Sequence, residues 1–159
     1  MNDTELSRYI TDNFAGVDVV VSSGDSFFFY NPDPNIPPDH MFPWATLVTS
    51  DHNDPFSDLN RPSVYRLNIG VSKATVQSLF GELKPASKDE SADQPVFSGF
   101  DYTALDQLMP HPVYGKMHWV SVLNPSDATL ETTVRPLLDE AYATAVSKFS
   151  KTHSTAPRC

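Results

Sequence analysis

The sequence predicts an α+β domain built on a mainly antiparallel sheet of about five strands, with helices at both ends. Apolar residues recur at helical spacing near each end of the chain. Short aromatic or β-branched segments lie between them, and the connections between these segments are too short for most parallel crossovers. The length of 159 residues fits one domain, which we place at residues 1–151, with a frayed tail at residues 152–159.

The first half of the chain predicts one helix and three strands. Leu6, Ile10 and Phe14 form an apolar stripe in a helix over residues 4–14, with Thr4 or Asp3 as its N-cap. The strands expected after it are short segments at residues 17–21, 26–30 and 44–49. Turn residues between the first two strands predict a hairpin.

The second half begins with an alternating strand, residues 64–71, and a helix, residues 73–80, which Ser72 caps and Gly81 ends. Residues 82–100 show no periodicity and are interpreted as a mobile insert. The remaining expected elements are one or two helical turns at residues 103–109, a strand at 117–123 and a helix from about 132 to 151.

The last helix has one apolar face. Pro136 falls in its expected first turn, where a missing N–H does no harm. The spacing predicts that Tyr142 and Phe149 are buried against the sheet. The polar residues expected to remain in water are Asp139, Glu140 and Lys148.

The charge pattern disfavours nucleic acid as a partner. Twenty acidic residues against eleven Lys and Arg give a net charge of −9, and residues 1–60 contain Arg8 as their one base. Phosphate backbones require clustered bases, which the sequence does not contain. No apolar run approaches the ~18 residues of a membrane span, no secretory signal is recognisable, and Cys159 is the single cysteine. We therefore expect a cytoplasmic protein that neither enters a membrane nor binds nucleic acid.

Several catalytic and cofactor motifs are missing. The sequence has no G-x-S-x-G motif, and its six glycines form neither G-x-G-x-x-G nor a phosphate-binding loop. Asp51, His52, Asp54 and Asp58 share one loop, but their spacing matches no established metal motif. The sequence thus predicts no bound cofactor and no metal, and it disfavours nucleophilic catalysis.

The segment from Pro110 to Trp119 is the strongest candidate for chemistry. Two prolines hold His111 in a stiff backbone, and Tyr114 and His118 lie within seven residues of it. A histidine could act there as a general base with the phenol as acid, although a rigid loop leading into a strand would show the same residues.

Polar residues on the strand at 64–71 form a second candidate. Arg66 and Asn68 share one face and could clamp an anion, although a half-exposed sheet would show the same alternation. We therefore expect a domain that binds a small ligand or a protein partner, with an enzyme based on His111 or His118 as the alternative. The expected ligand-binding residues are Arg61, Arg66, Asn68, His111, Tyr114 and His118.

The chain also resembles known families. His118-Trp119, the segment at 137–146 and the strand and helix at 65–80 are similar to MmcQ/YjbR-like proteins. A wider pattern resembles an uncharacterised microbial domain-of-unknown-function family of about 150 residues. Its marks are residues 25–30, 42–49, 58–62, 65–69 and 111–115. The first resemblance implies a double-wing α+β architecture and, as suggested for some members, DNA binding, which the charge of −9 disfavours.

Overall fold

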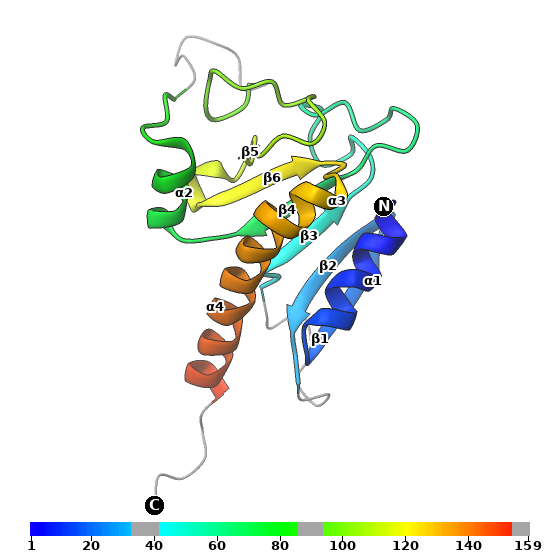
Figure 1. Cartoon of the computed structure of the whole chain (residues 1–159), viewed down its shortest axis with the longest axis vertical. Helices are drawn as coiled ribbons and strands as arrows, with labels where there is room; N and C mark the ends of the chain where they lie inside the picture. Colours follow the sequence, from blue (N-terminus) through cyan, green and yellow to red (C-terminus); the bar gives the residue numbers. More distant parts are fainter. Residues whose placement is uncertain (33–41, 86–93, 154–159) are drawn as a thin grey trace, which may run out of the picture.

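The computed structural model describes residues 1–32, 42–85 and 94–153. It shows an α+β fold with one antiparallel sheet of six strands in the order β1-β2-β3-β4-β6-β5 (Figure 1). The strands are β1 (Val17–Ser22), β2 (Asp25–Tyr30), β3 (Ala45–Val48), β4 (Arg66–Gly70), β5 (Met109–Pro110) and β6 (Trp119–Leu123). The predicted fold class is confirmed, and the strand beyond the five expected is the two-residue β5.

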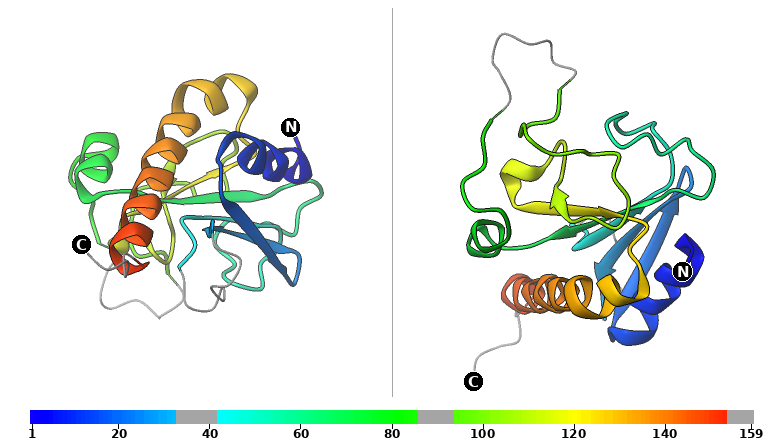
Figure 2. Two further views of the ribbon diagram at one scale, coloured as in Figure 1. Left: turned by 90° about the horizontal axis from the view of Figure 1, so that it is seen from below. Right: turned by 45° about the horizontal axis from the view of Figure 1, so that its top comes forward.

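The helices are α1 (Asp3–Asn13), α2 (Lys73–Phe80), α3 (Asp127–Thr129) and α4 (Arg135–His153). Figure 2 shows α1 and α4 on one side of the sheet and long loops on the other. Within the described residues, no helix combines the length and apolarity needed to cross a bilayer.

The main core lies between the sheet and the two long helices. Leu67 and Ile69 point from β4 into this core, where they meet Leu138 and Ala141 of α4 among other buried residues. A smaller apolar cluster lies under the loops on the opposite face and includes Leu59, Met109 and Leu123. Both faces of the central strands are therefore buried.

Two helix starts differ from the prediction. The N-cap of α1 is Asn2, whose side chain accepts from Glu5 N–H while Glu5 accepts from Asn2 N–H. The C-terminal helical segment starts at Asp127, because Ser126 caps it. A π-helical turn at Leu130–Val134 lies directly before Arg135-Pro136, so that the proline sits within a longer helical segment.

The helical turns expected at residues 103–109 are not present. Leu105 instead forms an isolated parallel bridge with Leu123, and β5 follows as an edge strand. The carbonyl oxygen of Thr103 accepts a hydrogen bond from Arg61, which holds this segment across the loops. Pro110 is tolerated in β5 because the strand lies at the edge of the sheet.

The last helix presents the predicted face, but three residues differ in exposure from the prediction. Tyr142 and Phe149 are half-buried rather than buried, and both rings meet Tyr30 edge-on, at centroid distances of 5.6 and 5.3 Å. Asp139 and Lys148 are exposed as expected. Glu140, which was expected to remain in water, instead accepts hydrogen bonds from Ser72 N–H, at 2.8 Å, and from the Thr75 hydroxyl. These bonds connect α4 to the start of α2.

Candidate functional site

Arg66 is the centre of a buried polar network on the loop-covered face of the sheet. Its guanidinium is 1% exposed and makes two hydrogen bonds with Asp54, of 3.0 Å from Nη1 to Oδ1 and 2.6 Å from Nη2 to Oδ2. Ser57 Oγ accepts from Nη1 at 2.9 Å, and Asn68 Oδ1 accepts from Nε at 3.1 Å. Four donor contacts thus go to protein atoms, which leaves the guanidinium little capacity for a ligand.

Strand register extends this network across the sheet. Asn68 pairs with Thr46 of β3 on one side and with Ser121 of β6 on the other. Asn68 Nδ2 donates to Thr46 Oγ1 at 2.9 Å, and Ser121 Oγ donates to Asn68 Oδ1 at 2.7 Å. The predicted alternation along β4 is present, but its polar side is covered by loops rather than half-exposed.

His111 lies beside this network as a neutral side chain. Its Nδ1 accepts from the N–H groups of Val113 and Tyr114, both at 3.0 Å. Burial and the neighbouring positive charge of Arg66 lower the pKa of His111 to about 3. The ring nitrogen that a general base needs is therefore engaged in holding the turn after Pro110.

Asp54 carries the opposite charge beside this histidine. Burial alone would raise the pKa of Asp54, but the hydrogen bonds and positive charge of Arg66 outweigh it and hold that pKa below its ordinary value. The network therefore contains a carboxylate and a guanidinium at neutral pH, next to an uncharged imidazole.

We expect His111 to make the protein less stable as the pH falls from 7 to 5. The unfolded chain takes up a proton near pH 6.5, whereas the folded chain does so only near pH 3. The unfolded state therefore binds more protons in this range, and stability falls by at most about 1.4 kcal/mol per pH unit. Chemical denaturation at several pH values measures this slope.

His111→Asn is the matched variant for this prediction. An asparagine side chain can accept the same two backbone hydrogen bonds but does not titrate. The slope between pH 7 and 5 should be smaller in the variant than in the wild type. Asp54 affects stability mainly below its ordinary pKa of 3.8 and so does not contribute in this range. Equal slopes in both proteins would contradict the assignment.

The other three expected ligand-binding residues lie apart from the centre of the network. Arg61 donates to backbone oxygens of Ser57, Asp58 and Thr103 and so braces the loops. The Tyr114 ring is 5.1 Å from that of His111 and 54% exposed. His118 lies elsewhere, beside α2. Of the six residues, His118 lines the groove described below, and the other five do not.

The acidic residues and the histidine of the loop at residues 51–58 also have separate partners. Asp54 pairs with Arg66, His52 pairs with Asp25, and Asp51 accepts from Leu59 N–H. Among the residues that the structure describes, no three His, Cys, Asp or Glu side chains form a group that could hold a metal ion.

His118 lines a groove between α2 and the 3₁₀ turn at Gly115–Met117. This α2 groove has a volume of about 300 Å³. Its floor is apolar and consists of Val76, Leu83 and Phe97. The other residues that line it are Lys73, Gln77, Gly81, Glu82, Gly115, Lys116 and His118.

Backbone contacts hold the two sides of the α2 groove together. His118 adopts the left-handed conformation, with φ of 69°, and its carbonyl oxygen accepts from Val71 N–H, just before α2, at 2.9 Å. The carbonyl oxygen of Phe97 accepts from the Tyr102 hydroxyl at 2.7 Å. At Gly115 an added Cβ would lie 3.0 Å from the Phe97 ring, so glycine allows the ring to pack against the turn.

Sequence reasoning found part of this groove. Lys116 and His118 belong to the segment singled out between Pro110 and Trp119. Phe97 falls within the segment interpreted as an insert, of which residues 86–93 lie outside the described part of the chain. The aromatic character of Phe97 was the available signal, but nothing in the sequence indicates that it meets Gly115.

A family model described as a family of unknown function, DUF6194, matches residues 1–154, and the chain belongs to this family. The match confirms the expected resemblance to an uncharacterised family of this length. It does not show the MmcQ/YjbR-like resemblance, and the double-wing architecture is not confirmed. No curated protein and no solved structure matches the chain.

Proposed function

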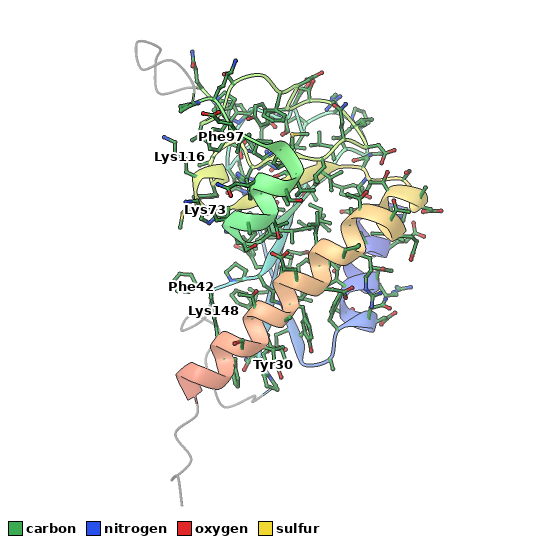
Figure 3. All side chains as sticks on the ribbon, turned by 60° about the vertical axis from the view of Figure 1, so that its left-hand side comes forward. Tyr30, Phe42, Lys73, Phe97, Lys116 and Lys148 are labelled. Carbon is green, nitrogen blue, oxygen red and sulfur yellow. The ribbon has the colours of Figure 1, made fainter. Side chains whose placement is uncertain are left out.

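We propose that this member of the family binds a small carboxylate with an apolar body in the α2 groove. The observation that carries the proposal is a pair of lysines that line a groove together with an apolar floor. Lys73 and Lys116 both line the groove, and Figure 3 shows them on the same side of the molecule as Phe97. Neither ammonium has an ion-pair or hydrogen-bond partner among the described residues.

Charge favours an anion at this place. The chain carries a net charge of −9, yet two lysines gather here with His118, and Glu82 is the one acidic residue that lines the groove. An anionic head between the ammonium groups would supply the partners that the protein does not provide.

The floor favours an apolar body on the ligand. Val76 is buried, and Leu83 and Phe97 are half-buried, so a ligand resting on them would remove further apolar surface from water. A volume of about 300 Å³ is at the lower end of the range for small-molecule sites. Together these features suit a short aliphatic or aromatic carboxylate.

Octanoate tests the proposal, with octanol as the neutral probe of the same chain length. Amide chemical shifts recorded during a titration should change at residues 73–83 and 115–118 with octanoate. Lys73→Gln together with Lys116→Gln should weaken octanoate binding about tenfold, because two charge contacts at ~0.2–1 kcal/mol each are lost. Octanol binding should be unchanged by this double variant.

Lys148→Gln is the matched control, since Lys148 is an exposed lysine on α4 outside the groove. Its octanoate affinity should equal that of the wild type. Shift changes elsewhere in the protein, or the same loss of affinity in the control and the double variant, would overturn the proposal.

A further inference from the structure

A second group of polar side chains, Ser50, His52 and Asp25, lies at the other end of β4 from the α2 groove. Ser50 and His52 belong to the loop before β4, and Asp25 is the first residue of β2. The Asp25 side chain is 1% exposed at the start of β2, and its Oδ2 is 2.9 Å from His52 Nε2. On the other side of the imidazole, Nδ1 is hydrogen-bonded to Ser50 Oγ. Serine, histidine and aspartate thus form one continuous hydrogen-bonded chain.

Two further hydrogen bonds hold the Asp25 carboxylate in place. Asp25 Oδ1 accepts from Thr49 N–H at 3.0 Å, and Oδ2 also accepts from Asn53 Nδ2 at 2.7 Å. Because an ionised carboxylate only accepts, a neutral His52 must carry its proton on Nε2. Its Nδ1 then has a free lone pair, to which the Ser50 hydroxyl donates.

We propose that Ser50 is a nucleophile and His52 its general base in the hydrolysis of small esters, with Asp25 as the positioning residue. In Ser-His-Asp hydrolases the serine usually meets Nε2 and the aspartate Nδ1. Here the two ring nitrogens are exchanged, and either nitrogen can perform either role. The imidazole of His52 is 43% exposed and Ser50 is half-buried, so a substrate can reach the Ser50 hydroxyl and the imidazole.

The reaction balances with water as the second substrate. Ser50 Oγ attacks the carbonyl carbon of the ester, and its proton passes to His52 Nδ1. The C–O bond to the alcohol breaks, and the alcohol leaves with that proton. Water then attacks the acyl group and gives a proton to Nδ1, which returns it to Ser50 Oγ as the acid is released.

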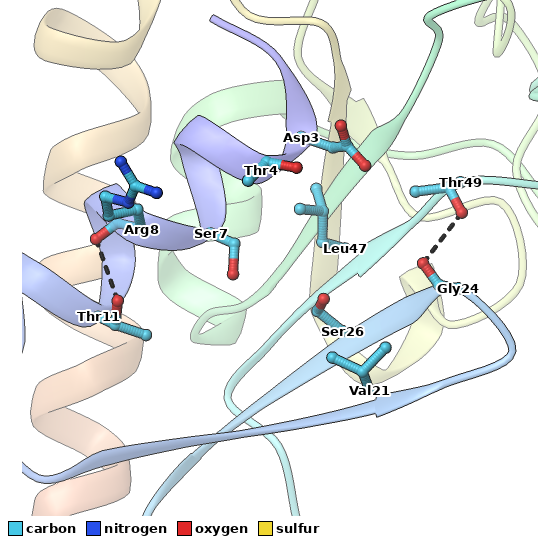
Figure 4. Close-up of a pocket in the computed structure, with 10 residues that line it drawn as sticks. All are labelled: Asp3, Thr4, Ser7, Arg8, Thr11, Val21, Gly24, Ser26, Leu47 and Thr49. Atoms are coloured by element: carbon cyan, nitrogen blue, oxygen red, sulfur yellow. Dashed lines mark hydrogen bonds between the residues drawn. The ribbon is translucent and has the colours of Figure 1, made fainter.

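A separate hollow lies between α1 and the strands, and none of Ser50, His52 and Asp25 lines it. Gly24 and Thr49 line it and flank Asp25 and Ser50 in the sequence (Figure 4). Its volume is about 370 Å³. Arg8 also lines it and, within residues 1–32, 42–85 and 94–153, has no partner for its guanidinium. Asp3 supplies a carboxylate to this lining, and Thr4, Ser7, Thr11, Ser26 and Thr49 supply hydroxyl groups. The hollow therefore does not define the substrate, and the proposal rests on the contacts among Ser50, His52 and Asp25.

A fluorophosphonate probe tests the nucleophile directly. The full-length protein should carry one label per molecule, and peptide mapping by mass spectrometry should place that label on Ser50. Ser50→Ala and His52→Gln should each lose labelling at least tenfold. Ser78→Ala, which changes an exposed serine on α2, should label like the wild type. An unlabelled wild type, or a label mapped to another residue, would overturn the proposal even if a variant fails to fold.

Two further measurements test the positioning residue and the reaction. Asp25→Asn should change the pH dependence of the labelling rate, because it removes the carboxylate that stabilises the imidazolium; an unchanged pH profile would contradict its role. The wild type should cleave p-nitrophenyl acetate, and Ser50→Ala should lose this activity at least tenfold. A wild-type rate no higher than that of Ser50→Ala would contradict ester hydrolysis at Ser50.

Discussion

Replacing Asp54 by alanine should lower the free energy of unfolding by about 3–5 kcal/mol. The variant removes both carboxylate oxygens that Arg66 contacts and leaves a guanidinium, 1% exposed in the wild type, without its counter-charge. Ser57 and Asn68 still accept hydrogen bonds from Arg66, but neither supplies a charge. Urea denaturation near pH 7 measures the loss.

A double variant separates the charge from the packing. Arg66→Met in the Asp54→Ala background removes the unpaired charge and fills the space with an apolar chain, so part of the lost stability should return. Asp12→Ala is the matched control, since it removes an exposed aspartate of α1 that has no hydrogen bond or ion pair within the described residues. If Asp54→Ala is no more destabilising than Asp12→Ala, Arg66 does not depend on this carboxylate.

Local pattern was enough to predict most of the secondary structure. The helix at Lys73–Phe80 has the cap at Ser72 and the stop at Gly81 that its sequence indicates. The alternation along residues 66–70 correctly separates the apolar face of β4 from its polar face. Both signals depend on neighbours in the sequence, which is why they are readable without a structure.

The burial and the hydrogen-bond partners of polar side chains could not be predicted from neighbouring residues in the same way. Arg66 and Asn68 were correctly placed on one face, but whether loops cover that face depends on contacts such as Asp54–Arg66, twelve residues apart. The same holds for His52, which lies in the loop after β3 and whose partner Asp25 is the first residue of β2. The Ser-His-Asp arrangement proposed above has no local motif, so a search for G-x-S-x-G cannot detect it.

Truncating Tyr142 to alanine should cost about 3 kcal/mol, at the lower end of the range for core aromatic residues because its ring is half-buried. The ring lies 4.9 Å from that of Phe14 and 5.6 Å from that of Trp44, measured between centroids, and so joins α4 to α1 and to the segment before β3. Its hydroxyl also donates to the carbonyl oxygen of Ala15. Thermal and urea denaturation measure the loss.

Two variants show which contacts of Tyr142 matter. Tyr142→Phe keeps the ring and loses only the hydrogen bond to Ala15, so it should cost about 1 kcal/mol. Lys148→Ala changes an exposed side chain of the same helix and should stay within ±0.5 kcal/mol of the wild type. If Tyr142→Ala were as stable as Lys148→Ala, the aromatic cluster would not hold α4 against the sheet. If Tyr142→Phe lost as much as Tyr142→Ala, the hydroxyl rather than the ring would be the main contact.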